Sequence, residues 1–412
     1  MRKKYGIRLT AAAVAVAAAP FLVTQAFENP PDMNRLMAAA VNFTADSGFA
    51  TETVDFGNGS LILYKPKSSE AAVSTVSGGE TPESSGTYEQ SEAQDTLNEE
   101  SSLAPITEPA QEKPEDGKDP ETTGQYIITQ NINQDSEDLT VFDSNDLEVF
   151  KNTFGSVNGT NYIWLEKGGQ VRNCTELDND FVREQTKINT DISLKAFSDQ
   201  PQVLIMHTHA CESYLVGSGD YQDESYTCRT TDPNQSVVAV GQKISEKLAE
   251  KGICVIHDGT MHDYPAYNGC YDRAEDTVSS ILKKYPTIKV VLDVHRDGIV
   301  ESDGTPVAAV NEINGRQAAQ VMIISAASDG YYYVPNYLDN FHFACLLQGQ
   351  MESENPGITR PVLFQYCQYN QHLTTGSLLL EIGSQGNTLE QALYTAELIG
   401  DSIGNALLTL CS

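Results

Sequence analysis

The chain has 412 residues, a length that usually corresponds to two or three domains. Its 57 acidic residues outnumber 26 basic ones, which gives a formal net charge of -31 at pH 7. Because this charge would repel a nucleic-acid backbone or an anionic lipid surface, we exclude nucleic acid as a partner. The eight cysteines form no CxxC pair, so there is no zinc-finger or redox motif, and several are expected to be small buried side chains.

Residues 1–27 combine a basic start with an apolar stretch. Four basic residues, the last of them Arg8, precede an uncharged run of 19 residues from Leu9 to Phe27. This is either a secretory signal peptide, with Thr24-Gln25-Ala26 as a cleavage site, or an uncleaved signal anchor, which the bilayer-spanning length favours. The positive-inside rule then places the remaining chain outside the cytoplasm. The expected location is the cell membrane with a single pass, or secretion if the segment is cleaved.

Composition divides the rest of the chain into four segments. Residues 28–66 form a short extracytoplasmic segment to which the sequence assigns no function. Residues 67–124 contain few large apolar side chains and cannot offset their chain entropy by burial, which predicts a disordered acidic linker. Order is expected to resume in residues 125–200, an N-terminal extension that packs on the main domain. That main domain spans residues 201–412.

The main domain alternates between apolar runs of strand length and amphipathic stretches of helix length. This order predicts an α/β fold, with a mostly parallel sheet, right-handed crossovers and helices on both faces. A hairpin is expected around Asn314-Gly315. Strands are expected at 203–206, 254–256, 289–294 and 377–380, and helices at 236–250, 272–285, 336–351 and 389–410.

Residues that can bind a metal follow three of these apolar strands. The first strand ends in His207-Thr-His209 with Glu212 just beyond, the third leads into His295, and the last leads into Glu381. Ligands of such sheets bind beyond the carboxyl ends of the strands, so we expect these side chains to lie close together. His207 and His209 are two residues apart, and an extended backbone would point both imidazoles to the same face.

Histidines and a carboxylate at one edge of a sheet match a hydrolytic zinc site. Zinc takes three protein ligands there and keeps a position for a water molecule, whose pKa falls to about 7. A further carboxylate that does not bind the metal accepts the proton of this water. Glu381 suits that catalytic role, because it follows directly on a run of leucines.

Each of these residues also has a simpler interpretation. A single histidine at the end of a strand is more often a structural hydrogen-bonding residue than a ligand. In this simpler interpretation, Asp293 and Asp297 only hold Arg296 in an ion pair. His257 and His262, after the second strand, either line a substrate groove or supply a ligand. The joint occurrence of such residues at three strand ends favours the metal site.

Further motifs occur along the same domain, all in one order. They are His207-Thr-His209-Ala-Cys-Glu212-Ser-Tyr214, Thr231-Asp-Pro-Asn234, Val237-Val238, Val240-Gly241, Val255-Ile-His257-Asp258, His262-Asp-Tyr-Pro265, Tyr267-Asn-Gly269, Tyr271-Asp-Arg273, Asp293-Val-His295-Arg-Asp297 and Glu381-Ile-Gly383. In these stretches the chain resembles the stage II sporulation protein P family of endospore-forming bacteria. The resemblance is close over about residues 200–410 and extends to the N-terminal half only in layout.

The resemblance implies an amidase-like fold for residues 201–412, similar to that of the zinc-dependent N-acetylmuramoyl-L-alanine amidases. It implies Zn²⁺ as the cofactor, His209 and His295 as ligands, and Glu381 as the catalytic residue. The substrate would be peptidoglycan, cleaved between muramic acid and the stem peptide, with an additional endopeptidase activity on cross-links. The setting would be septal wall thinning and engulfment during endospore formation, with the stage II sporulation proteins D and M as partners.

One departure from the amidase pattern concerns the third ligand. Amidases take a glutamate near the start of the first helix, where this chain has Asp232-Pro-Asn234-Gln235. Either Glu212 or a weaker ligand in that stretch replaces it; we favour Glu212 and keep His207 as a ligand or a neighbouring partner. The departure leaves open a non-catalytic cell-wall-binding or scaffolding protein with the same fold. A general metallopeptidase is disfavoured, because the sequence has no HExxH motif.

Overall fold

The structure is a computed structural model that describes residues 48–56, 59–67, 147–217, 219–222 and 226–412. The expected signal segment at 1–27, nearly all of the expected linker and the first part of the extension lie outside these residues. Within the described ranges, no helix combines the length and the apolar character needed to cross a bilayer.

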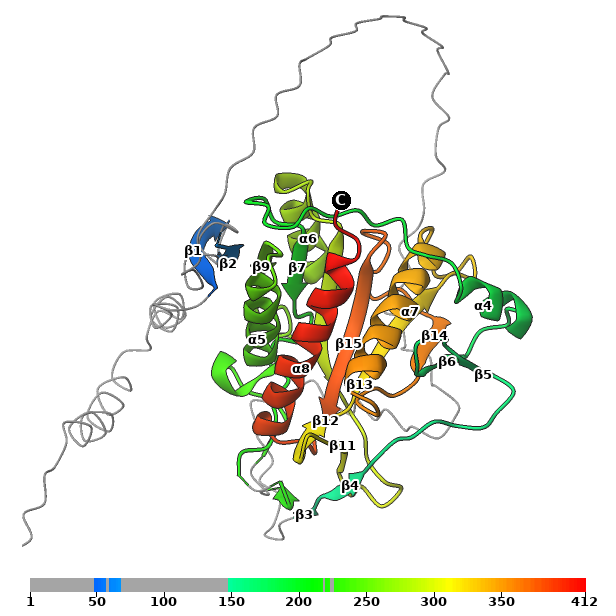
Figure 1. The fold of residues 1–412 in the computed structure, drawn as a ribbon. Helices are drawn as coiled ribbons and strands as arrows, with labels where there is room; N and C mark the ends of the chain where they lie inside the picture. The colour runs from blue at the N-terminus through cyan, green and yellow to red at the C-terminus, as the bar shows by residue number, and fades with distance from the viewer. Residues whose placement is uncertain (1–47, 57–58, 68–146, 218, 223–225) are drawn as a thin grey trace, which may run out of the picture.

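The fold is built on one large mixed sheet (Figure 1). Its strands are β1 (Phe49–Phe56), β2 (Gly59–Pro66), β5 (Tyr162–Trp164), β6 (Gln170–Asn173), β7 (Val203–Met206), β9 (Val255–His257), β10 (Val290–Asp297), β13 (Val321–Ala327), β14 (Val362–Tyr366) and β15 (Ser377–Ser384). They lie in the order β1-β2-β9-β7-β10-β15-β13-β14-β6-β5. The strands β9, β7, β10 and β15 are parallel neighbours, which confirms the predicted α/β class. Beyond them the sheet is mixed, because β13 runs antiparallel to β15 and β2 antiparallel to β9.

Helices cover both faces of this sheet, as predicted (Figure 1). The helices are α4 (Asn179–Gln185), α5 (Val237–Glu250), α6 (Cys270–Lys284), α7 (Tyr337–Glu354) and α8 (Leu389–Leu408). The larger core lies under α5, α7 and α8 and contains Ile205 and Leu292, whereas α6 covers a second core with Leu204 on the opposite face. Successive residues of β7 therefore point into different cores, as the pleat of a strand requires. All eight cysteines are unpaired, and five of them are buried.

A small sheet lies at the carboxyl end of β10 and β15 (Figure 1). It contains β12 (Arg316–Ala319), β11 (Val307–Ile313) and β4 (Phe150–Asn152), and a separate pair is formed by β3 (Leu147–Glu148) and β8 (Tyr221–Gln222). The predicted hairpin is present, since Ile313 pairs with Arg316 across Asn314-Gly315. Both turn residues have positive φ angles, 52° and 76°, which a two-residue hairpin turn requires. β4 pairs with β11, so this part of the extension packs on the main domain.

Several strands of the large sheet were not expected from the sequence. Residues 48–66, which the sequence analysis assigned to a separate short segment, form the hairpin β1–β2 at the edge of the sheet beside β9. Its strand β2 is buried on both faces, because Leu61 and Leu63 enter one core and Ile62 and Tyr64 enter the other. This burial depends on contacts with residues almost 200 positions away in the sequence. The strand β14 was also missed.

Tyr64 provides a test of how tightly this hairpin packs. Its side chain is 1% exposed, and its buried hydroxyl has no hydrogen-bond partner among the described residues. Since an unpaired buried hydroxyl is unfavourable, we expect Tyr64→Phe to raise the free energy of unfolding by about 1 kcal/mol. Tyr64→Ala should lower it by about 3 kcal/mol or more, because it leaves a cavity. Urea denaturation measures both changes, and similar destabilisation by the two variants would contradict this packing.

Candidate active site

Three of the predicted ligands meet at the carboxyl end of β7 and β10. Atoms able to bind a metal on His209, Glu212 and His295 all lie within 4.8 Å of one another. His209 Nδ1 is 3.2 Å from Glu212 Oε1, and His295 Nδ1 is 3.6 Å from Glu212 Oε2. All three residues are buried. The parallel pairing of β7 with β10 brings them together, because both strands run toward the same edge of the sheet.

Arg296 holds the turn that carries Glu212. The backbone N–H of Arg296 donates to Glu212 Oε2 at 3.0 Å. Its guanidinium donates to the carbonyl oxygens of Ser213 at 2.7 Å and Cys228 at 2.6 Å, which fixes the chain on both sides of the site. Burial would raise the pKa of Glu212, but the hydrogen bond from His209 and the nearby positive charges hold it well below its usual value. Glu212 is therefore ionised, as a metal ligand must be.

Asp293 lies against the other side of His295. Its Oδ1 is 2.8 Å from His295 Nε2, and its two oxygens also accept hydrogen bonds from the backbone and the hydroxyl of Thr208, at 2.8 and 2.6 Å. Burial lowers the pKa of His295, but the charge of Asp293 outweighs this and raises it to about 10. A carboxylate behind a histidine is the usual arrangement that orients a metal-binding imidazole.

The simpler interpretation of Asp293 and Asp297 is wrong. Among the described residues, neither aspartate forms an ion pair with Arg296. Asp293 contacts His295 and Thr208, whereas Asp297 accepts a hydrogen bond from Arg360 Nη1 at 2.7 Å. Both carboxylates therefore belong to the surroundings of the site.

His207 lies outside the group of three. Its Nδ1 is 2.8 Å from the carbonyl oxygen of Val294, so this nitrogen carries the proton, and its Nε2 accepts from His257 Nε2 at 2.9 Å. Burial lowers the pKa of His207 to about 4, so the ring is neutral. The expectation that His207 and His209 face the same way does not hold, because β7 ends at Met206 and a turn follows.

The remaining histidines do not join the group either. His257 is the partner of His207, and His262 Nε2 lies 3.9 Å from Asp258 Oδ2. His342 Nε2 contacts Gln185 at 3.0 Å, and His372 contacts Glu275 at 3.3 Å. The structure thus separates two ligand candidates, His209 and His295, from histidines with structural contacts.

Glu381 lies beside this group on the next strand. It pairs with His295 in the parallel register of β10 and β15, so both side chains project from the same face. Burial, followed by the charge of Asp297, raises the pKa of Glu381 to about 8, although His295 opposes the shift. Its Oε2 is buried and has no hydrogen-bond partner among the described residues. A carboxylate with a raised pKa near neutrality is suited to general acid and base catalysis.

The stretch that replaces the usual glutamate of amidases is occupied by local contacts. Asp232 Oδ1 accepts hydrogen bonds from the backbone and side chain of Asn234, both at 3.0 Å, and caps the short 3₁₀ helix Pro233–Gln235. The group around His209 includes Glu212 and no residue from this stretch. The geometry thus agrees with the choice of Glu212 over a ligand near the start of α5.

The three residues fit a zinc ion. Two imidazoles and one carboxylate form one of the ligand sets of catalytic zinc sites. His209 Nε2 is buried without a hydrogen-bond partner in the described part of the chain, a costly state that a bound cation or water would relieve. Glu212 and Asp293 supply the negative charge that a divalent cation requires. The arrangement can therefore hold a metal next to a carboxylate that does not bind it.

Aromatic side chains form a wall next to the group. Tyr267 stacks on His209 with ring centres 4.9 Å apart, and Tyr271 meets the same imidazole edge-on at 5.4 Å. Arg229 lies 5.2 Å from the centre of the Tyr267 ring. In the sequence both tyrosines stand out only as parts of motifs, since no periodic pattern marks a residue as the neighbour of a distant histidine.

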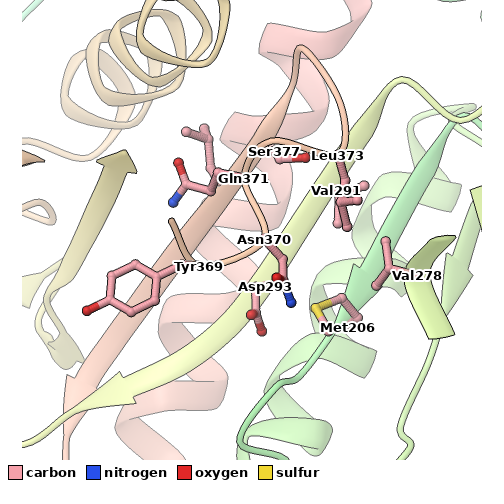
Figure 2. Close-up of a pocket in the computed structure, with 10 residues that line it drawn as sticks. Met206, Val278, Val291, Asp293, Tyr369, Asn370, Gln371, Leu373 and Ser377 are labelled. Atoms are coloured by element: carbon pink, nitrogen blue, oxygen red, sulfur yellow. The ribbon is translucent and has the colours of Figure 1, made fainter. Parts of the chain in front are cut away.

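A small hollow lies beside this site and not within it. Figure 2 shows that it opens between β10, β7, α6 and the loop that carries Tyr369 and Asn370. Its lining is mainly apolar and includes Asp293 but none of the three candidate ligands. It therefore borders the aspartate that orients His295.

The sequence was compared with protein families and with curated proteins. The model of the stage II sporulation protein P family matches residues 74–404. The stage II sporulation protein P of Bacillus subtilis strain 168 is 27% identical over 221 residues, which are 49% of this chain and 50% of that protein. The chain thus matches about half the length of this curated relative.

Solved structures give more distant similarities. The N-acetylmuramoyl-L-alanine amidase AmiC2 of Nostoc punctiforme is 12% identical, with 52% of this chain and 97% of that chain covered and a TM-score of 0.31. The CwlD amidase from Clostridioides difficile, in complex with the GerS lipoprotein, is 10% identical, with 50% and 99% covered and a TM-score of 0.33.

Gly241 tests the assignment of His207 to a structural pair. A Cβ atom at this position of α5 would lie 2.5 Å from His207 Cε1 and 3.1 Å from His257 Nε2. Because both rings are buried and hydrogen-bonded, we expect Gly241→Ala to lower the free energy of unfolding by about 1–3 kcal/mol through overpacking. Gly155→Ala is the control, since its Cβ would meet nothing within 4 Å. Equal stability of the two variants in urea denaturation would refute the packing described for His207.

Proposed function

The chain belongs to the stage II sporulation protein P family, and we propose that it is a zinc-dependent peptidoglycan hydrolase of endospore formation. The proposed reaction is cleavage of the amide between muramic acid and the stem peptide, with a further endopeptidase activity on cross-links. The observation that supports it best is the buried group of His209, Glu212 and His295 beside Glu381 on the paired strand.

The chain's own residues would divide the work as follows. His209, Glu212 and His295 would hold the zinc ion, and Asp293 and Arg296 keep them in position through the contacts described above. Bound zinc supplies a water molecule of lowered pKa and polarises the amide carbonyl. These roles need only side chains that are already buried and oriented in the structure.

Glu381 would transfer the proton in this reaction. Its Oε2 takes a proton from the attacking water and delivers it to the nitrogen of the leaving peptide. The buried surroundings that raise the pKa of Glu381 to about 8 help the carboxyl group to keep the proton until it is delivered. Because Glu381 projects from the same face as His295, one substrate amide can contact both.

The biological setting is part of the proposal. The N-terminal segment would anchor the protein in the cell membrane and place the catalytic domain in the septal space outside the cytoplasm. There it would thin the septal wall and act in engulfment, together with the stage II sporulation proteins D and M. The family resemblance of the sequence supports these partners.

Zinc content tests the choice of ligands. We expect the purified full-length chain to bind one zinc ion, and His209→Ala and Glu212→Ala to weaken binding by more than the roughly 10- to 100-fold that changes outside the ligands cost. His207→Gln should keep the zinc, because both ring nitrogens of His207 already have protein partners. Elemental analysis after dialysis against a competing chelator gives the measurement. If only His207→Gln lost its zinc, His207 would be a ligand and His209 and Glu212 would not.

Muropeptide release tests the catalytic role of Glu381. We expect Glu381→Gln to lower the rate by about 10²–10⁴-fold, because the amide cannot carry the proton. Glu390→Gln, at an exposed position of α8, is the matched control and should retain full activity. Activity that survives both thorough zinc removal and Glu381→Gln would rule out this mechanism. Binding to cell walls without any product, in a zinc-loaded sample, would instead support a scaffolding protein.

A further inference from the structure

Arg360 is a buried cation with hydrogen-bonding capacity that the described residues do not use. It is 2% exposed and lies two residues before the start of β14. Its Nη1 donates to Asp297 Oδ2 at 2.7 Å. Its Nε and Nη2 are also buried but have no hydrogen-bond partner among the described residues. Each unmet donor is unfavourable in the interior, so this state calls for an explanation.

The two unused nitrogens form one edge of the guanidinium. In arginine the N–H groups of Nε and Nη2 point in parallel from the same side of the planar group, whereas Nη1 lies on the other side. Asp297 therefore takes up one side and leaves a complete two-donor fork on the other. Such a fork matches the two oxygens of a carboxylate in spacing and in charge.

This fork lies close to Glu381 and to the metal-binding group. Asp297, its partner, follows His295 by two residues on β10. The backbone N–H of Arg360 donates to the carbonyl of Val321 at 2.7 Å, and Val321 pairs with Ile382, the residue after Glu381. The positive charge of Arg360 also opposes the rise in the pKa of Glu381, so the two groups are close enough to interact. A peptide that crosses Glu381 would thus extend toward Arg360.

Phe154 closes this side of the site. The centre of its ring is 5.8 Å from the guanidinium carbon of Arg360, and its backbone is fixed by Gln320 through hydrogen bonds of 2.7 and 3.0 Å. The ring packs on Ile299 and Val307, so apolar groups lie beside the guanidinium. A charge-assisted bond is stronger in such surroundings than in water.

The geometry points to Arg360 as the residue that recognises a carboxylate of the substrate. This inference rests on the proposed function and adds a substrate class to it. The preferred substrates are muramyl peptides with a free carboxylate on a residue close to the scissile amide, in preference to the corresponding carboxamides. A carboxamide offers one acceptor and one donor group, and its N–H₂ would face an N–H of the fork.

The test compares two muramyl-L-alanyl peptides, whose second residue carries either a free α-carboxylate or a carboxamide. Binding to the full-length chain is measured by calorimetry, and turnover is measured separately. We expect the carboxylate peptide to bind about tenfold more tightly or better, in line with charge-assisted hydrogen bonds. Arg360→Lys should reduce this preference, because lysine preserves a cation for Asp297 but has no two-donor fork. Arg183→Gln, an exposed change in α4, should retain the preference.

Three results would overturn the inference: equal binding of both peptides by the unchanged protein, a preserved preference in Arg360→Lys, or an equal loss for both peptides. The first of these results needs no variant, so the proposal can be refuted even if Arg360→Lys does not fold. Preference in binding without any turnover would refute the proposed hydrolysis and leave the role of Arg360 standing. Turnover of both peptides with equal efficiency and equal affinity would refute the role of Arg360 and leave the proposed hydrolysis standing.

Discussion

The site depends on one buried carboxylate, that of Glu212. Placing a charge in the interior is expensive unless it is paired and hydrogen-bonded. Glu212 meets this condition through His209, His295 and the backbone N–H of Arg296. These contacts come from both strands that the site spans, so the turn after β7 can adopt few other positions. To bind a metal, the two carboxylate oxygens of Glu212 would have to turn toward it. The neighbouring positive charges already keep this carboxylate ionised.

The sequence was sufficient to find the residues that meet at the sheet edge. His209, Glu212, His295 and Glu381 follow or end apolar runs, and the parallel order of those runs implies that their ends converge. The sequence did not show whether His207 is a metal ligand or a neighbouring partner. The strand stops at Met206, and a partner 50 residues away, His257, takes the free nitrogen. The end of the strand was predicted, but the distant partner leaves no pattern in a single sequence.

The same limit applies to the edges of the fold and to Arg360. The middle of strand β2 alternates between two cores, so positions 61–64 all carry large apolar side chains and no polar face marks them as a strand. The ends of β10 and β15 were placed too early, because the polar residues that serve the site still belong to the ladder. Arg360 is an isolated basic residue in an unremarkable stretch, and only its buried surroundings distinguish it.

Glu381 is close to two differently charged groups, and this determines how a substrate can lie. The candidate metal ligands supply a place for an electron-rich carbonyl, and Arg360 supplies one for an anion. His295 and Glu381 lie on paired strands, and Arg360 is tied to the same sheet by its hydrogen bonds to Val321 and Asp297, so the sheet fixes the distance between the two recognition points. A fixed distance between two recognition points selects for the position of a carboxylate along the peptide as well as for its presence. The direction of the peptide across β15 is therefore set by the same pairing that assembles the catalytic group.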